Sequence, residues 1–173
     1  MNAEIKRLIH AFRNALVLAA DIRSNECFHM ARWKELNEFP HGCCDLASNF
    51  LAQYLQDSDP SLQPVIVHML ASEQFREDHN STIHSHVIVR LDGWYIDLTL
   101  NQFAEYRNRV VIDSRTGTLG TLLRHIRNCD GTVTECGIEL DVPGENGAAL
   151  YAWLRAAADS LLVASGPSAS GDQ

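Results

Sequence analysis

The alternation of apolar and polar residues is most regular between residues 84 and 99. Two runs rich in β-branched and aromatic residues flank Asp92-Gly93, which is a strong short-range signal for a two-residue hairpin turn. Such a turn predicts three cross-strand pairs: Leu91 with Trp94, Val89 with Ile96, and Val87 with Leu98. Because side chains alternate across a strand, one face of this hairpin consists of these six residues and is entirely apolar.

The opposite face of the hairpin is mixed and mostly polar. It contains His84, His86, Ile88, Arg90, Tyr95, Asp97 and Thr99. His86 is expected opposite Thr99 and diagonal to Asp97, and diagonal neighbours lie roughly 7–8 Å apart at the backbone, within reach of long side chains. An imidazole beside a carboxylate, backed by an apolar face, is how a base and its orienting acid would be built. The alternative interpretation is a half-buried hairpin whose polar face is simply hydrated.

Apolar residues at helical spacing predict the flanking elements. The pattern indicates helices at residues 3–22, 43–55, 118–128 and 147–163, and a less regular helix at 25–37. Shorter apolar runs predict strands at 64–70 and 109–113 and a strand-and-turn segment at 129–140. Residues 71–83 are expected to form a polar loop that borders a substrate groove.

Length and composition favour one globular domain. The chain has 173 residues, of which 46% are hydrophobic, enough for a proper core. We expect an α+β domain over residues 1–164, with N-terminal helices at 3–37, a catalytic core at 39–113 and a C-terminal part at 114–164. The small, polar residues 165–173 are expected to be a disordered tail.

Charge and cysteine content exclude several classes of protein. The formal net charge is −8 and no Lys/Arg-rich run is visible, which argues against a nucleic-acid partner and favours a basic or neutral substrate. The first residues lack the layout of a secretory signal, and the apolar run at 15–20 is too short to cross a bilayer. We therefore expect a soluble, cytoplasmic protein with no membrane partner. Five cysteines are an odd number, unlike a disulfide framework.

Two adjacent cysteines, Cys43 and Cys44, follow Gly42 where a helix is expected to begin. Free backbone N–H groups and the helix dipole stabilise a thiolate in the first turn of a helix. The structural alternative is a small apolar residue that packs a helix end. These cysteines could also form a metal site with His84 and His86, but adjacent helical positions point about 100° apart and rarely chelate one ion. No metal and no cofactor are therefore expected.

Three short motifs resemble a known family when taken in order. They are Gly42-Cys43-Cys44 opening a helix, Ser85-His86 opening a strand, and Ile96-Asp97-Leu98-Thr99 closing the next strand. Together they resemble the transglutaminase-like branch of the papain-like cysteine protease superfamily. The longer runs Phe39-Pro40-x-Gly42-x-Cys44 and Ile96-Asp97-x-Thr99-x-x-Gln102-Phe103 are similar to small bacterial proteins described as transglutaminase-like. The resemblance covers roughly the middle third of the chain.

This resemblance implies a papain-like fold, in which a nucleophile helix packs on an antiparallel sheet with flanking helices. It also implies a catalytic triad: a Cys44 thiol nucleophile, His86 as the proton carrier, and Asp97 to fix the imidazole tautomer. The Cys-x-Asp-x-Ala spacing of some relatives would select Cys43 instead, whereas the Gly-x-Cys spacing selects Cys44. Three further residues are candidates around this triad: Gln102 and Thr99 as polar supports, and His84 as a reserve base.

The expected activity is cysteine-dependent acyl transfer on a protein or peptide substrate, first of all hydrolysis of a peptide or isopeptide bond. A glutamine deamidase and a transglutaminase use the same thioester chemistry and differ only in substrate or acceptor, so both remain alternatives. An alternative of another class is a catalytically inactive papain-like module that holds a peptide. The sequence does not indicate an oligomeric state.

Overall fold

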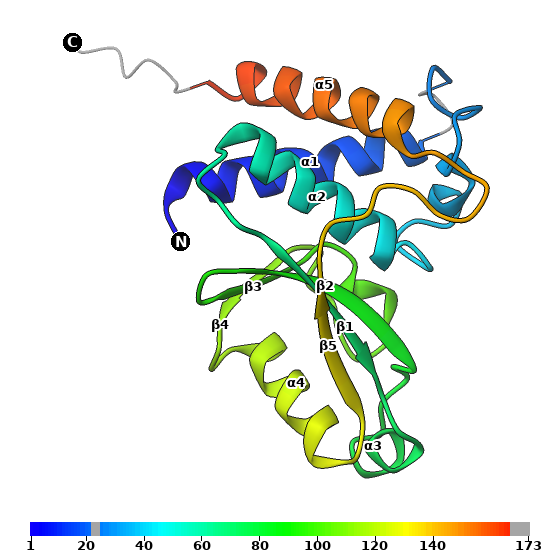
Figure 1. Cartoon of the computed structure of the whole chain (residues 1–173), viewed down its shortest axis with the longest axis vertical. Coiled ribbons are helices and arrows are strands. Elements are labelled where there is room, and N and C mark those ends of the chain that lie inside the picture. The colour runs from blue at the N-terminus through cyan, green and yellow to red at the C-terminus, as the bar shows by residue number, and fades with distance from the viewer. Residues whose placement is uncertain (22–24, 167–173) are drawn as a thin grey trace.

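The computed structural model describes residues 1–21 and 25–166 and has an antiparallel sheet between two layers of helices (Figure 1). The sheet has five strands in the order β4-β3-β2-β1-β5. Their bounds are β1 (Val65–Leu70), β2 (Ser85–Leu91), β3 (Trp94–Asp97), β4 (Val111–Ser114) and β5 (Thr132–Cys136). Each neighbouring pair is antiparallel. The predicted α+β class is confirmed.

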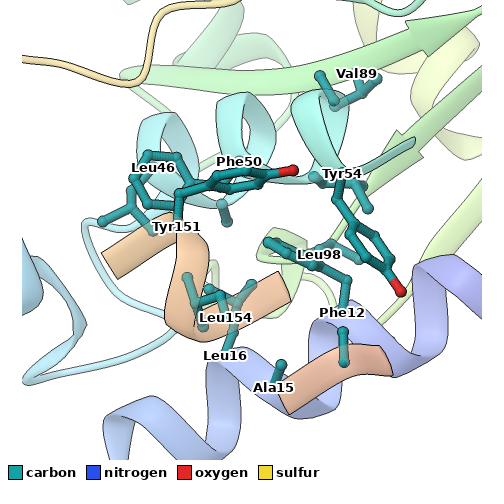
Figure 2. Packing of buried hydrophobic residues seen from close by; sticks show 14 of the residues in the cluster. Phe12, Ala15, Leu16, Leu46, Phe50, Tyr54, Val89, Leu98, Tyr151 and Leu154 are labelled. Atoms are coloured by element: carbon teal, nitrogen blue, oxygen red, sulfur yellow. The ribbon is translucent and has the colours of Figure 1, made fainter. Parts of the chain in front are cut away.

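Three long helices cover one face of the sheet: α1 (Ala3–Ala20), α2 (Cys44–Ser58) and α5 (Ala148–Ala164) (Figure 1). They share a hydrophobic core with the apolar face of the β2–β3 hairpin (Figure 2). At its centre the rings of Phe12 and Tyr54 stack with their centroids 5.0 Å apart. This core holds α2, and with it Cys44, firmly against the sheet.

The other face of the sheet is covered by α4 (Thr118–Asn128) (Figure 1). A second apolar cluster forms there between strand residues such as Val67 and Ile88 and helix residues such as Leu122 and Ile126. Ile88 and His86 are both fully buried on this face. The hydrated-face interpretation is therefore wrong at these two positions, since the mixed face of the hairpin is a second interior surface.

The predicted hairpin is confirmed. Leu91 lies opposite Trp94 and Val89 opposite Ile96, and Asp92 takes the left-handed conformation that a tight turn requires, with φ 53°. The predicted Val87–Leu98 pair is outside the ladder, because β3 ends at Asp97.

The helix predicted at 25–37 is wrong. The chain forms turns there and one short 3-10 helix, η1 (Trp33–Leu36). Arg32 interrupts any longer helix, because it adopts the left-handed conformation with φ 67°. That conformation directs its buried guanidinium to the carboxylates of Glu35 and Asp45 and to the carbonyl oxygen of Leu140.

The polar loop predicted at 71–83 contains a short helix, α3 (Glu73–Asp78). The Ser72 hydroxyl caps it by accepting a hydrogen bond from the Phe75 N–H, and Phe75 is buried in the second cluster. The first helix ends at Ala20. Ile22, its predicted last residue, lies outside the described residues. Residues 167–173 of the expected tail also lie outside them. Within the described ranges, no helix combines the length and apolarity needed to cross a membrane.

Candidate active site

The antiparallel pairing of β2 and β3 brings His86 and Asp97 to one end of the sheet. His86 is the second residue of β2, and Asp97 is the last residue of β3. Each lies two positions along its strand from a residue packed in the second cluster, Ile88 and Tyr95 respectively. Because side chains two apart share a face, both functional groups project from the face that α4 covers.

A short hydrogen bond joins these two side chains. Nε2 of His86 lies 2.5 Å from Oδ2 of Asp97, and neither side chain is exposed to solvent. The second carboxylate oxygen accepts hydrogen bonds from the backbone N–H of Thr99 at 2.8 Å and from its hydroxyl at 3.3 Å. The carboxylate is therefore held from both sides, and it fixes the orientation of the imidazole.

Phe103 also contacts the imidazole, edge to face, with ring centroids 5.0 Å apart. The sequence motifs predict no role for this residue. Its only signal was its place at the end of the run that begins with Ile96-Asp97.

The thiol of Cys44 meets the imidazole from the other layer of the molecule. Cys44 is the first residue of α2, and its side chain lies close enough to His86 to help raise the pKa of the imidazole. Since Nε2 of His86 is occupied by Asp97, Nδ1 is the nitrogen left for the sulfur. Cys44 is partly exposed, whereas Cys43 beside it is buried.

The surroundings of His86 favour its protonated form. Burial by itself would lower the pKa of this imidazole, but the charge and hydrogen bond of Asp97 outweigh burial. The hydrogen bond and charge of Cys44 act in the same direction, and the net effect raises the pKa of His86 well above its ordinary value of 6.5. An imidazolium between a carboxylate and a sulfur is the arrangement that stabilises a thiolate.

Cys43 points away from this cluster. It is fully buried, and its sulfur donates hydrogen bonds to the carbonyl oxygens of Glu35 at 2.8 Å and His41 at 3.2 Å. Burial, together with the negative charges of Glu35 and Cys44, raises the pKa of Cys43 to about 12. Of the two adjacent thiols, only Cys44 is brought to His86.

Gln102 links the segment before Cys44 to the segment after Asp97. Its Oε1 accepts a hydrogen bond from the Gly42 N–H at 3.2 Å, and its Nε2 donates to the carbonyl oxygen of Thr99 at 3.1 Å. The same Nε2 lies 3.5 Å from Nδ1 of His86. Gln102 belongs to a short 3-10 helix, η2 (Leu100–Gln102), which sets its side chain between the two segments.

The remaining candidate, His84, is not part of the cluster. Its side chain is exposed, and its backbone carbonyl accepts a hydrogen bond from the Ala71 N–H. With His84 in solvent and the Cys43 sulfur turned toward Glu35, the four ligands considered for a metal do not converge. In the part of the chain that the structure describes, no group of three or more His, Cys, Asp or Glu side chains could hold a metal ion.

Comparison with known proteins gives relatives but no function. No protein-family model and no solved structure matches the chain. Over 113 residues it is 37% identical to the uncharacterized protein YuaU of Escherichia coli K12, and the protein of the same name from Escherichia coli UTI89 matches with the same identity. Each match covers 65% of this chain and 48% of the relative, so the chain spans about half the length of these curated relatives.

Proposed function

We propose that the chain is a cysteine-dependent acyl-transfer enzyme with Cys44 as nucleophile, His86 as proton carrier and Asp97 as orienting acid. The observation that carries this proposal is the contact of the Cys44 thiol with an imidazole whose other nitrogen is bound to a buried carboxylate. A nucleophile, a base and a group that orients the base are the parts that covalent acyl transfer requires.

The same observation supports a relation to the transglutaminase-like branch of the papain-like enzymes. A helix that begins with the nucleophile packs on an antiparallel sheet, and neighbouring strands supply the histidine and the aspartate. We infer a papain-like core from this arrangement and from the three motifs in the sequence.

In the proposed reaction the Cys44 thiol first passes its proton to Nδ1 of His86. The thiolate then attacks an amide carbonyl carbon, and a C–S bond forms as the carbonyl π electrons move to oxygen. When the tetrahedral intermediate collapses, the C–N bond breaks and the amine leaves with the proton from His86, which gives a thioester. Water, deprotonated by His86, attacks the thioester and releases the acid, and the proton returns to the Cys44 sulfur.

The backbone N–H of Cys44 is a proposed donor to the oxyanion, since the first N–H groups of a helix lack partners within the helix. Gln102 is proposed as a positioning residue. By holding the Gly42 N–H and the Thr99 carbonyl together, it fixes the distance between the nucleophile segment and the segment that carries Asp97.

The choice of Cys44 over Cys43 follows from access. Attack on a carbonyl carbon requires an accessible thiol and a proton acceptor; Cys44 is partly exposed and interacts with His86. The Cys43 sulfur is enclosed, its proton is shared with two carbonyl oxygens, and burial keeps its pKa high. We infer that Cys43 is a structural residue at the helix start.

Two measurements test this assignment. Iodoacetamide should label Cys44 at mildly acidic pH faster than the exposed Cys136, with tandem mass spectrometry separating Cys43 from Cys44. Separately, a proteome-derived peptide mixture is incubated with the protein and monodansylcadaverine. New amino termini would indicate a peptidase, a 1 Da gain at glutamine a deamidase, and incorporated amine a transglutaminase.

The matched control is Cys43→Ala beside Cys44→Ala. We expect Cys44→Ala to abolish the product and Cys43→Ala to retain it. Loss of product in Cys43→Ala alone would mean that the wrong sulfur has been assigned. Labelling of Cys44 no faster than that of Cys136, together with no product of any kind, would leave an inactive peptide-binding module as the better description.

A further inference from the structure

A cavity of about 440 Å³ lies beside the proposed active site, between α1, the turn at residues 39–40 and the loop at 101–109. Its lining includes two arginines, Arg13 and Arg109, and the amide of Asn101. Two links along the chain and one hydrogen bond connect it to the catalytic cluster. Asn101 immediately precedes Gln102, the turn leads into the Gly42–Cys44 segment, and Arg13 donates through Nε to the carbonyl oxygen of Leu98, the residue after Asp97.

Arg13 is a buried cation that forms no ion pair within the described part of the chain. Only 5% of it is exposed, and its guanidinium lies 4.3 Å from the centroid of the Phe39 ring. Only its Nε has a hydrogen-bond partner among residues 1–21 and 25–166, so its two terminal nitrogens are left for the cavity. Burial, followed by the positive charge of Arg109, lowers the pKa of Arg13 to about 10, against a smaller opposing effect of Cys43. Arg13 remains charged at neutral pH.

Arg109 faces the same cavity from its exposed side. Over the described ranges, neither Arg13 nor Arg109 forms an ion pair with a carboxylate within 4.0 Å. Two like charges that share a cavity repel each other, and an anion placed between them removes that cost.

Asn101 supplies an independent observation at the same place. Its Oδ1 atom is buried and has no hydrogen-bond partner among the described residues. A buried amide without a partner is costly, and rotation of the amide would present its NH₂ group instead. A ligand with acceptor oxygens would then satisfy it.

We propose that this cavity binds a carboxylate carried by the peptide substrate, held by Arg13, Arg109 and the amide of Asn101. The proposal rests on the proposed function in that the ligand is taken to be the acyl-transfer substrate. A planar carboxylate matches the fork of a guanidinium, and the cavity places it close to the Cys44 segment. One carboxylate of the protein, Asp21, also lines the cavity, so the site suits a single carboxylate better than a polyanion.

This site reverses the preference suggested by the net charge. The chain carries a formal charge of −8, which favoured a basic or neutral substrate, whereas the cavity is lined by two arginines and one aspartate. Local charge decides binding at a site, because salt screens charges more than about 8–10 Å away.

The test measures binding without turnover, in the full chain carrying Cys44→Ala. The probes are four pools of fluorescein-labelled hexapeptides, randomised over uncharged residues, with either Glu or Gln at the third position and either an acid or an amide at the C-terminus. Fluorescence anisotropy gives the dissociation constant of each pool. We expect at least one acidic pool to bind roughly tenfold more tightly than its amide counterpart, as a charge-assisted contact would give. The pool that binds shows whether the carboxylate is a side chain or a chain end.

The decisive variants are Arg109→Gln and Arg107→Gln. Both residues are exposed on the same loop, but only Arg109 lines the cavity, so Arg107→Gln controls for a general loss of positive charge. The proposal predicts that Arg109→Gln abolishes the preference and Arg107→Gln retains it. Equal binding of acidic and amide pools, or an unchanged preference in Arg109→Gln, would overturn it. Since Cys44→Ala cannot turn over, this result is independent of whether the chain proves to be an acyl-transfer enzyme.

Discussion

Replacing Asp97 with asparagine tests the electrostatic basis of the proposed triad. In the structure a fully buried carboxylate lies 2.5 Å from Nε2 of a fully buried imidazole. An opposite charge within about 4–6 Å shifts a pKa by roughly 1–3 units, and short distance with complete burial places this pair toward the upper end of that range. We therefore expect Asp97→Asn to lower the pKa of His86 by about one to three units.

The reactivity of Cys44 should follow this change. Transfer of a proton from the thiol to the imidazole becomes about tenfold less favourable for each unit by which the pKa of His86 falls. At pH 6 the rate of iodoacetamide labelling at Cys44 should thus fall by roughly tenfold to a thousandfold. The asparagine amide would also donate to Nε2, so that the ring proton must sit on Nδ1, which can then no longer accept the thiol proton.

The assay is the second-order labelling rate at Cys44, measured between pH 5 and pH 10 by peptide mapping, with circular dichroism to verify folding. The variant should approach the wild-type rate at the alkaline end, because a thiolate forms there without help from histidine. Asp113→Asn is the matched control, since Asp113 lies on the neighbouring strand opposite Tyr95, whereas the carboxylate bonded to His86 is that of Asp97. Equal rates at pH 6 for Asp97→Asn and wild type would refute the argument that Asp97 controls the charge on His86.

Two further predictions concern stability, and both are measured as free energies of unfolding in urea. Gly120→Ala should destabilise the protein by about 1–3 kcal/mol, although alanine normally stabilises a helix interior, because the new Cβ would lie 2.0 Å from the Arg115 carbonyl oxygen. Gly137→Ala is the control, since nothing lies within 4 Å of a Cβ added there. Equal losses of unfolding free energy in the two variants would contradict a steric clash at Gly120. Phe12→Ala should lower the free energy of unfolding by about 3–5 kcal/mol, because Phe12 is fully buried in the core. A loss below about 1 kcal/mol would show that the core collapses around the missing ring.

Local patterns predicted most of the secondary structure. The helix at 118–128 has the bounds expected from its spacing, and the Asp92-Gly93 turn fixed the register of the hairpin. The errors came from residues whose roles depend on distant contacts. Arg32 breaks the helix expected at 25–37 because its partners include Asp45 and Leu140, and no local pattern shows those contacts.

The sequence also indicated which side chains could form a site, but only in part how they meet. Period-two alternation placed His86 and Asp97 on one face of a hairpin, and their hydrogen bond is in the structure. The choice between two adjacent thiols could not be made this way. It depends on where the start of α2 packs against the sheet, which leaves Cys43 enclosed and turns Cys44 toward His86.

Sequence by itself determined the elements and the residue types available for chemistry, because turn residues and hydrophobic period act over short distances along the chain. Tertiary structure decided what lies on the second face of the sheet, which thiol is accessible, and that Arg13 and Arg109 face one cavity. These outcomes depend on packing between segments up to about a hundred residues apart, such as Arg13 and the loop at 101–109. Burial and the charges of neighbouring segments then set the pKa of His86, and packing leaves Arg13 without a counter-ion among the described residues. Neither effect follows from local sequence.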